Sequence, residues 1–177
     1  MRKELFEFRH IVKHIGGHAA LRDVSLRLYQ DEITFLVGRG SGRSVLSQMM
    51  MGELTPDSGT MLLLEKPYQP LSPEKAHERG IFCVTQNTKL IQNLSLSENI
   101  YIARPLSGIW HRGQADAFAR MACQECGIQL DLSKKASHVK LIDTLMVYCL
   151  RALLVRAQLL ILDNRLYLLS EKDIDLL

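Results

Sequence analysis

The sequence of 177 residues is poor in cysteine and aromatic residues, and it has no long uninterrupted apolar run. Four scattered cysteines and 6% aromatic residues do not fit a disulfide-stapled secreted domain. The N-terminus lacks the apolar segment of a secretory leader. Residues 145–162 are the most apolar stretch, but Arg151, Arg156 and Gln158 interrupt it, and a membrane span needs about 20 mostly apolar residues. These absences predict a cytosolic protein without a transmembrane helix.

An excess of charge of one sign is also missing. The chain has 22 Lys and Arg against 19 Asp and Glu, so its net charge is +3 with neutral histidines. It has neither the dense basic block nor the interleaved aromatic residues of nucleic-acid readers, so we expect no nucleic-acid partner. A content of 47% apolar and 23% charged residues is typical of a folded globular protein, and the length fits one domain.

The hydrophobic pattern predicts strands that alternate with helices. Residues 5–12 and 24–28 alternate as strands do, and Gly16-Gly17 between them predicts an antiparallel hairpin or meander. Further strands are expected at 32–37, 60–64, 81–84 and 158–162, and helices at 45–51, 72–79, within 97–127 and at 141–155. This order predicts an α/β core with a mostly parallel sheet.

A glycine-rich segment, Gly38 to Ser44, lies between the expected strand at 32–37 and the helix after it. Backbone N–H groups and the helix dipole at such a helix start attract phosphate. Arg43 would contact the outer phosphates and Ser44 a magnesium ion. The candidate nucleotide-binding residues are Gly38, Arg39, Gly40, Ser41, Gly42, Arg43, Ser44 and Val45.

The loop departs from the Walker A pattern at two positions. Val37 stands where the first glycine belongs, and Arg43 replaces the lysine. A tight turn is therefore the alternative interpretation of the loop, and a solvated side chain is the alternative for Arg39.

Two later strand ends support a nucleotide site. Leu159 to Asp163 is an aliphatic run that ends in a carboxylate, as in a Walker B motif, and Gln86 follows the strand expected at 81–84. A glutamine there suits magnesium ligation or the positioning of a water molecule. The candidate magnesium ligands are Ser44, Gln86 and Asp163.

Cysteine and histidine offer weaker signals. Cys123 and Cys126 form a C-x-x-C on an expected helix, where packing is favoured over a metal or redox role because no second ligand pair follows. His10, His14 and His18 are spaced four residues apart, which on a continuous helix would suit metal ligation. Gly16-Gly17 and the strand pattern interrupt such a helix, so we expect these histidines at surface positions on the hairpin.

Taken together, the chain resembles the ATP-binding subunits of ABC transporters, especially those of the sugar-import branch. The resemblance extends over Phe6–Phe8, residues 20–25, 54–59 and 94–100, and residues 157–163. It implies a P-loop NTPase core of the RecA-like type, with an antiparallel β-rich N-terminal part and an inserted helical subdomain. Residues 1–177 would form one nucleotide-binding domain, with its core at about 1–86 and 139–177 and the helical subdomain at about 87–138.

The resemblance also implies cofactors, partners and a location. It implies binding of ATP and Mg²⁺, with the family's Q-loop glutamine at Gln86 and its Walker B aspartate at Asp163. The subunit would be cytoplasmic and peripheral on the inner face of the cell membrane, where it joins a permease and a second ATP-binding subunit. The docking face is expected around Ile100, Ile102 and Trp110, with buried core as the alternative.

Departures from the family pattern affect catalysis. Asn164 stands at the general-base position, residues 139–143 contain no signature glycine, and Ile15 or His14 replaces the aromatic residue that stacks on adenine. The family's switch histidine does not appear before Leu177. We expect impaired or absent hydrolysis, which leaves enzymatic activity open, and a heterodimer rather than a homodimer. An ATP-independent regulatory or interaction module is the alternative, followed by another P-loop enzyme such as a small kinase.

Overall fold

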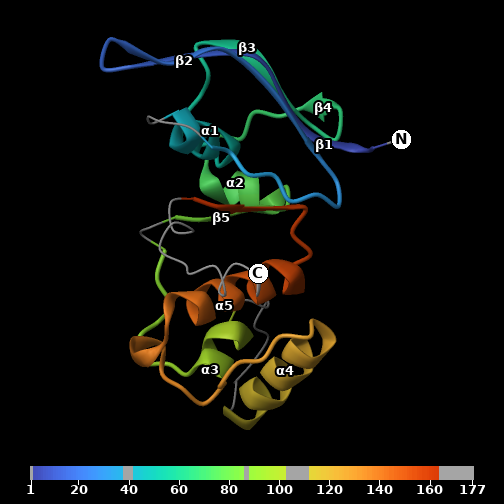
Figure 1. The fold of residues 1–177 in the computed structure, drawn as a ribbon, viewed down its shortest axis with the longest axis vertical. Helices are drawn as coiled ribbons and strands as arrows, with labels where there is room; N and C mark the ends of the chain where they lie inside the picture. Colours follow the sequence, from blue (N-terminus) through green and yellow to red (C-terminus); the bar gives the residue numbers. More distant parts are fainter. Residues whose placement is uncertain (1, 38–41, 86–87, 103–111, 164–177) are drawn as a thin grey trace. The chain divides into compact units, whose positions relative to one another are not determined.

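The computed structural model describes residues 2–37, 42–85, 88–102 and 112–163. The chain divides into two compact units, residues 1–81 and 82–177 (Figure 1). The first contains an antiparallel sheet and two helices, and the second contains three α-helices and most of a strand pair. No helix within the described ranges has the length and apolar character needed to cross a bilayer.

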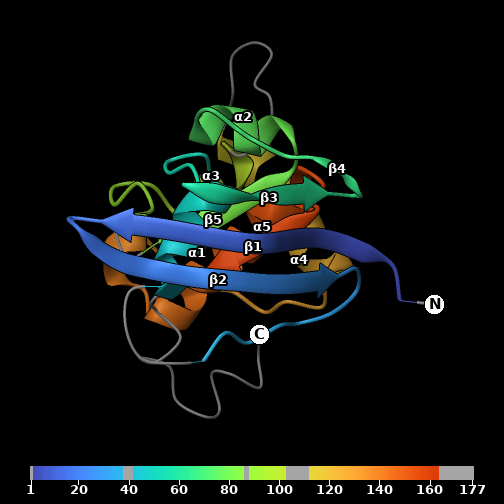
Figure 2. The ribbon, with the colours of Figure 1, turned by 90° about the horizontal axis from the view of Figure 1, so that it is seen from above.

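The sheet of the first unit is built around a long hairpin. Strands β1 (Glu4–Ile15) and β2 (His18–Tyr29) pair antiparallel, and the two glycines between them adopt φ of +57° and +81°, as a tight turn requires. β3 (Ser58–Leu63) pairs with the other edge of β1, and β4 (Lys66–Pro67) follows it, so the order is β2–β1–β3–β4 (Figure 2). The predicted antiparallel N-terminal part is confirmed.

The hairpin is distorted where His10 faces Asp23. Both residues have positive φ, at +52° and +54°, and His10 Nδ1 lies 2.7 Å from Asp23 Oδ1. The register of β1 and β2 shifts in this region, which marks a bulge. On the other side of β1, Gly59 of β3 has a φ of +93°, and a Cβ at this position would lie 2.4 Å from the His10 carbonyl oxygen. Glycine is therefore required at residue 59.

One face of this sheet carries the core of the first unit. Phe6 and Phe8 of β1 are almost completely buried. Helices α1 (Gly42–Met50) and α2 (Pro73–Glu78) lie on one side of the sheet (Figure 1). The Tyr68 hydroxyl donates to the Met50 carbonyl oxygen at 2.6 Å, which joins the end of α1 to the segment after β4.

The second unit is organised around one apolar cluster. The helices α3 (Leu96–Tyr101), α4 (Arg112–Glu125) and α5 (Leu141–Leu154) all contribute buried residues to it. Strands β5 (Ile81–Val84) and β6 (Leu159–Leu162) form a two-stranded sheet, and a short 3₁₀ turn covers Ala136–His138. Leu160 and Leu162 of β6 pack against the same cluster, so the strand pair and the helices share a core.

The strand predicted at 32–37 is wrong. These residues follow β2 without strand structure, and Ile33, Phe35 and Val37 are exposed by 81%, 65% and 89%. A strand needs a neighbour that pairs with its N–H and C=O groups, and in the described part of the chain no strand pairs with this segment. Alternating apolar residues were therefore not sufficient to form a strand.

The other predicted strands and helices are confirmed close to their expected bounds. The predicted helical stretch at 97–127 contains α3 and α4. The proposed division into a core and a helical subdomain of residues 87–138 stays a prediction, although α5, assigned to the core, shares the apolar cluster of α3 and α4.

Candidate functional site

The ends of β5 and β6 are paired. The backbone N–H of Asp163, the first residue after β6, donates to the carbonyl oxygen of Val84, the last residue of β5, at 2.9 Å. Gln86 follows Val84 by two positions in the sequence. Asp163, one of the predicted magnesium ligands, therefore lies beside the end of β5, the strand that precedes Gln86 in the sequence. Gln86 and Asn164 themselves lie outside the described residues.

Two threonines form a clasp at the end of β5. The Thr88 N–H donates to the Thr85 carbonyl oxygen at 3.1 Å, and the Thr85 N–H donates to Thr88 Oγ1 at 2.9 Å. The two hydroxyl oxygens lie 3.2 Å apart. Sequence reasoning missed this contact because neither threonine belongs to a recognisable motif; the available signal was a hydroxyl residue on each side of residues 86–87.

Helix α1 begins at the end of the glycine-rich segment. The first part of the predicted loop lies outside the described residues: Gly38, Arg39, Gly40 and Ser41. Gly42 packs closely on β2, since a Cβ there would lie 3.2 Å from Leu21 Cδ2. Arg43 is exposed, Ser44 is half-buried and Val45 is buried. Gly42 and Arg43 open the first turn, where the helix itself offers no acceptor to backbone N–H groups.

The hairpin tip is tied to the start of β3 by Asp57. Its carboxylate accepts hydrogen bonds from Lys13 Nζ at 2.8 Å and from the His14 N–H at 2.7 Å. His14 Nδ1 also lies 3.0 Å from this carboxylate. The Lys13 ammonium, followed by the two His14 contacts, lowers the pKa of Asp57 from 3.8 to about 2. His14 is therefore engaged with Asp57, while Ile15 is exposed by 45%.

Residues 139–143 contain the start of α5. Ile142 is buried, and the Lys140 N–H donates to Asp143 Oδ2 at 3.2 Å. The Asp143 carboxylate therefore occupies the N-terminus of α5, where the helix dipole favours an anion. A phosphate that approached this helix start would meet a carboxylate instead of a glycine-lined opening.

The expected docking face is not confirmed at its centre. Ile100 is completely buried in the apolar cluster of the second unit, so it cannot contact a partner. Ile102 is half-buried, and Trp110 lies outside the described residues. The alternative interpretation of Ile100, buried core, is the correct one.

The three histidines and Cys123 lie where the sequence predicted them, whereas Cys126 follows the end of α4. His10, His14 and His18 lie on the hairpin. Cys123 is buried on α4, where burial raises the pKa of its thiol, and Cys126 is exposed. Across the ranges that the structure describes, no group of three or more His, Cys, Asp or Glu side chains could hold a metal ion.

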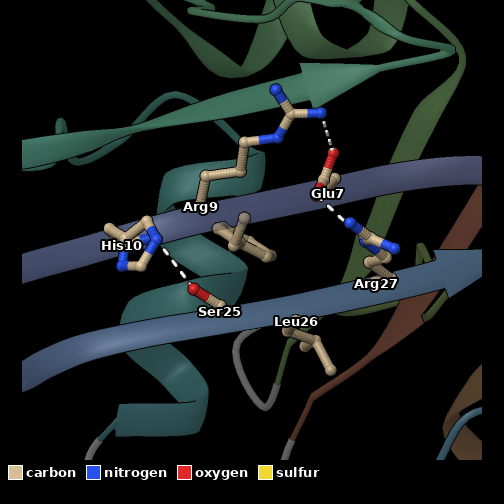
Figure 3. Close-up of a pocket in the computed structure, with 7 residues that line it drawn as sticks. Glu7, Arg9, His10, Ser25, Leu26 and Arg27 are labelled. Carbon is tan, nitrogen blue, oxygen red and sulfur yellow. Dashed lines mark hydrogen bonds and ion pairs between the residues drawn. The ribbon is translucent and has the colours of Figure 1, made fainter.

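A pocket of about 540 Å³ lies on the hairpin, away from the predicted site residues of the first unit (Figure 3). Its lining includes the nearly buried carboxylate of Glu7, which lies 2.6 Å from Arg9 Nη2 and 3.0 Å from Arg27 Nε. Arg27 also pairs with Glu4. Hydrogen bonds from Arg9 and then Arg27 lower the pKa of Glu7 against the opposing effect of burial. These charges neutralise one another, so the pocket presents no uncompensated group to a ligand.

Comparison with protein families gives a match to the model described as ABC transporter, over residues 21–166. An autoinducer 2 import ATP-binding protein of Enterobacter sp. strain 638 is 35% identical over 161 residues, covering 90% of this chain and 32% of the relative. A ribose import ATP-binding protein of Rubrobacter xylanophilus is 31% identical over 175 residues, covering 97% of this chain and 35% of the relative. The chain spans about a third of the length of these relatives.

Solved structures show the same fold. The ADP conformation of MJ1267, an ATP-binding cassette of an ABC transporter, matches 97% of this chain and 73% of its own, with a TM-score of 0.79 and 20% identity. The cbiO1 protein of Clostridium perfringens, part of a cbiONQ transporter complex, matches 98% of this chain and 70% of its own, with a TM-score of 0.78 and 21% identity. The predicted fold class, an α/β P-loop NTPase core, is confirmed.

Proposed function

The chain belongs to the ABC transporter family, and on this premise we propose that it is an ATP-binding subunit of an import system, with impaired or absent ATP hydrolysis. The relatives are named for the import of ribose and autoinducer 2, which supports a carbohydrate-like cargo. The observation that carries the proposal is the hydrogen bond between Asp163 and Val84, because it brings together the two strand ends expected to hold magnesium.

The first turn of α1 suits a nucleotide phosphate. The N-terminus of a helix attracts an anion through its dipole, and the exposed Arg43 adds a positive charge. The guanidinium of Arg43 is a planar fork rather than the compact charge of a lysine, so phosphate binding is expected to be weaker than in a complete Walker A loop. Val45 is buried, so only its backbone is available to a ligand.

The proposed magnesium ligands have suitable chemistry. The Asp163 carboxylate, the Gln86 amide and the Ser44 hydroxyl all offer oxygen atoms, which Mg²⁺ prefers. When bound, the ion would neutralise phosphate charge. Asp163 would contribute the negative charge, and Gln86 would orient an oxygen at the neighbouring strand end.

Hydrolysis is expected to be slow because Asn164 occupies the proposed general-base position. An amide cannot accept a proton as a carboxylate does, and loss of a general base lowers a rate by about 10²–10⁴. The proposed catalytic contribution is thus limited to Gln86, which would position a water molecule.

The start of α5 supports an asymmetric pair of subunits. In the proposed dimer, this segment would face the ATP of the partner, and the Asp143 carboxylate at the helix N-terminus would repel its phosphates. A second subunit with a complete signature loop would suit this chain better than another copy. We further propose a cytoplasmic position on the inner face of the cell membrane, where residues 87–138 dock on a permease.

Thermal melting with and without Mg-ATP tests the binding proposal. A ligand that binds only the native state raises the melting temperature, so we expect an upward shift with Mg-ATP. A phosphate-release assay on the same sample is expected to show little turnover. Robust turnover by the chain alone would contradict the impaired-hydrolysis proposal.

The alternative function is an ATP-independent interaction module. The carboxylate at the α5 N-terminus and the exposed Ile15 at the adenine position favour it. A melting temperature that stays unchanged up to millimolar Mg-ATP, together with capture of a permease, would support this alternative over the nucleotide-binding subunit.

A further inference from the structure

The C-x-x-C at the end of α4 consists of one buried and one exposed thiol. Cys123 is exposed by only 7% and belongs to the apolar cluster of the second unit, whereas Cys126 lies on the surface. The packing role that the sequence favoured for the pair therefore accounts for Cys123 alone. Burial, and then the neighbouring Cys126, raises the pKa of the Cys123 thiol, so the two thiols lie close enough to interact.

The two cysteines lie on one turn of helical backbone. The Cys126 N–H donates to the Ala122 carbonyl at 3.2 Å, so the hydrogen-bond pattern of the helix continues to Cys126. Residues three apart on a helix have Cβ atoms about 5–6 Å apart, and a disulfide needs a Cβ separation of about 3.5–4.5 Å. The turn must therefore tighten to join the two sulfur atoms, and the resulting bond would be strained.

The backbone after α4 leaves room for this movement. Gly127 has a φ of +67° and donates to the Gln124 carbonyl at 3.3 Å, and the Ile128 N–H donates to the Cys123 carbonyl at 2.9 Å. These two bonds form a Schellman motif, in which a glycine ends the helix. A Cβ at Gly127 would meet nothing within 4 Å, so the turn can tighten there without a steric clash.

We propose that Cys123 and Cys126 form a reversible redox modification site, which a low-molecular-weight disulfide such as oxidised glutathione converts into an intrachain disulfide. The exposed Cys126 thiolate attacks one sulfur of the glutathione disulfide, breaks its S–S bond and releases one glutathione thiolate. The Cys123 thiolate then attacks the Cys126 sulfur of the mixed disulfide and releases the second. The two cysteine protons pass to the released thiolates, and the two electrons of the cysteine pair reduce the glutathione disulfide.

The position after α4 defines the role of the pair. Thiols activated by a helix lie at its N-terminus, where the dipole stabilises a thiolate, whereas Cys126 follows a helix C-terminus. A strained disulfide is also easily reduced. The pair is therefore a modification site that follows the surrounding thiol–disulfide balance, and not a catalyst of disulfide exchange. This inference goes beyond the proposed function, because it requires no nucleotide.

Treatment of the native chain with oxidised glutathione, followed by mass spectrometry of the chain and its peptides, tests this inference. We expect the parent chain to lose the mass of two hydrogen atoms, to carry the linkage between Cys123 and Cys126, and to return to the dithiol in excess reduced glutathione. A chain that stays reduced, that retains glutathione on Cys126 without the intrachain bond, or that links either residue to Cys83 or Cys149 would overturn the proposal.

Single variants test the order of the two steps. Cys123→Ser lacks the second thiol, so we expect the reaction to stop at a glutathione adduct on Cys126. Cys126→Ser is expected to gain neither the adduct nor the bond, because Cys123 is buried. Cys149→Ser is the matched control, since Cys149 is a half-buried thiol on α5, and we expect it to form the same bond to the same extent as the parent.

The variants also provide outcomes that contradict the proposal. Loss of the bond in Cys149→Ser, or an intrachain bond that persists in Cys123→Ser, would show that a different pair of cysteines reacts. Cys123→Ala removes the same thiol and replaces Cys123→Ser should the serine variant not fold.

Discussion

At residue 59, β3 approaches β1 too closely for any side chain. A Cβ on Gly59 would lie 2.4 Å from the His10 carbonyl oxygen and 2.5 Å from that of Arg9, and the φ of +93° is unfavourable for other residues. We expect Gly59→Ala to lower the free energy of unfolding by more than about 2 kcal/mol, measured by urea denaturation. Gly17→Ala is the control, because Gly17 has a φ of +81° but nothing within 4 Å. It isolates the backbone strain, about 1–2 kcal/mol; equal losses in the two variants would contradict the steric argument.

Asp57 makes the stability of the folded chain depend on pH in the acid range. Its pKa falls from 3.8 to about 2 on folding, chiefly through Lys13, so the folded state favours the charged form. This contribution is fully present above about pH 4 and disappears as the pH falls towards about 2. We expect Asp57→Asn to be less stable than the parent at pH 7, with a difference that shrinks across this acid range in thermal melts. A difference that stays constant between pH 5 and pH 2 would rule out the ion pair as its cause.

Single site residues were predictable where the sequence carries a motif. Asp163 ends an aliphatic run, which is why its place at a strand end could be predicted, and the structure pairs it with Val84. Thr88 carries no such pattern, since threonine is common in loops and its bond to the Thr85 N–H depends on one side-chain orientation. Ile100 illustrates the opposite case, because an apolar side chain fits a docking face and a core equally well until burial is known.

Among the helices, α3 is held by a buried amide. The completely buried Asn99 donates from Nδ2 to the carbonyls of Ile91 and Ser95, each at 3.0 Å, and its Oδ1 accepts from the Ile91 N–H at 2.9 Å. Arg151 of α5 donates to the Asn99 backbone carbonyl at 2.8 Å and to Oδ1 at 3.1 Å. Asn99 therefore joins the loop before α3 to the last turn of α5.

Removal of this amide is expected to destabilise the second unit strongly. Asn99→Ala removes the side-chain oxygen that accepts from the Ile91 N–H and from Arg151 Nη2, and unsatisfied buried groups cost about 1–3 kcal/mol each. We expect a loss of about 3 kcal/mol in denaturant unfolding followed by circular dichroism. Ser95→Ala is the comparison, since it removes the N-cap of α3 and a contact with the Ser97 hydroxyl but leaves the Asn99 amide in place, and it should cost about 1 kcal/mol. Similar losses for the two variants would show that Asn99 acts only as a helix residue.

The elements differed in how well the sequence predicted them. The hairpin, α2 and α5 carry local signals such as paired glycines, a capping serine and a long apolar repeat. The segment at 32–37 has only its alternation, and whether such residues pair depends on a neighbour elsewhere in the chain. The local sequence pattern therefore predicts the hairpin, α2 and α5 correctly, whereas tertiary contacts determine whether residues 32–37 form a strand.

For the whole molecule, the family assignment predicts association with other proteins. In the proposed dimer, the carboxylate at the start of α5 would disfavour a pair of identical chains, so we expect this chain to stay monomeric in size-exclusion chromatography with Mg-ATP. Co-expression with a complete ATP-binding subunit and a permease from the same source is expected to yield a complex that elutes together. A stable homodimer with Mg-ATP would contradict the proposed asymmetry.

The fold class was predictable at this scale because the resemblance runs along most of the chain, as the match over residues 21–166 shows. The division at residues 81 and 82 was not, because it depends on which residues share one apolar cluster in the folded chain. Composition and periodicity describe each element alone and carry no information on such contacts.

The pairing order of β1 has a consequence for the route by which the first unit folds. β1 meets β2 across a two-glycine turn, whereas its other partner, β3, starts at Ser58 and must close a long loop. Hairpins form in about 1–10 μs, while distant pairing is slower because loop closure loses chain entropy. We therefore expect the hairpin to form early in the folding transition and Gly59 to dock on the His10 bulge late. In kinetic terms, substitutions at Gly59 would mainly accelerate unfolding, and those at the hairpin turn would mainly slow folding.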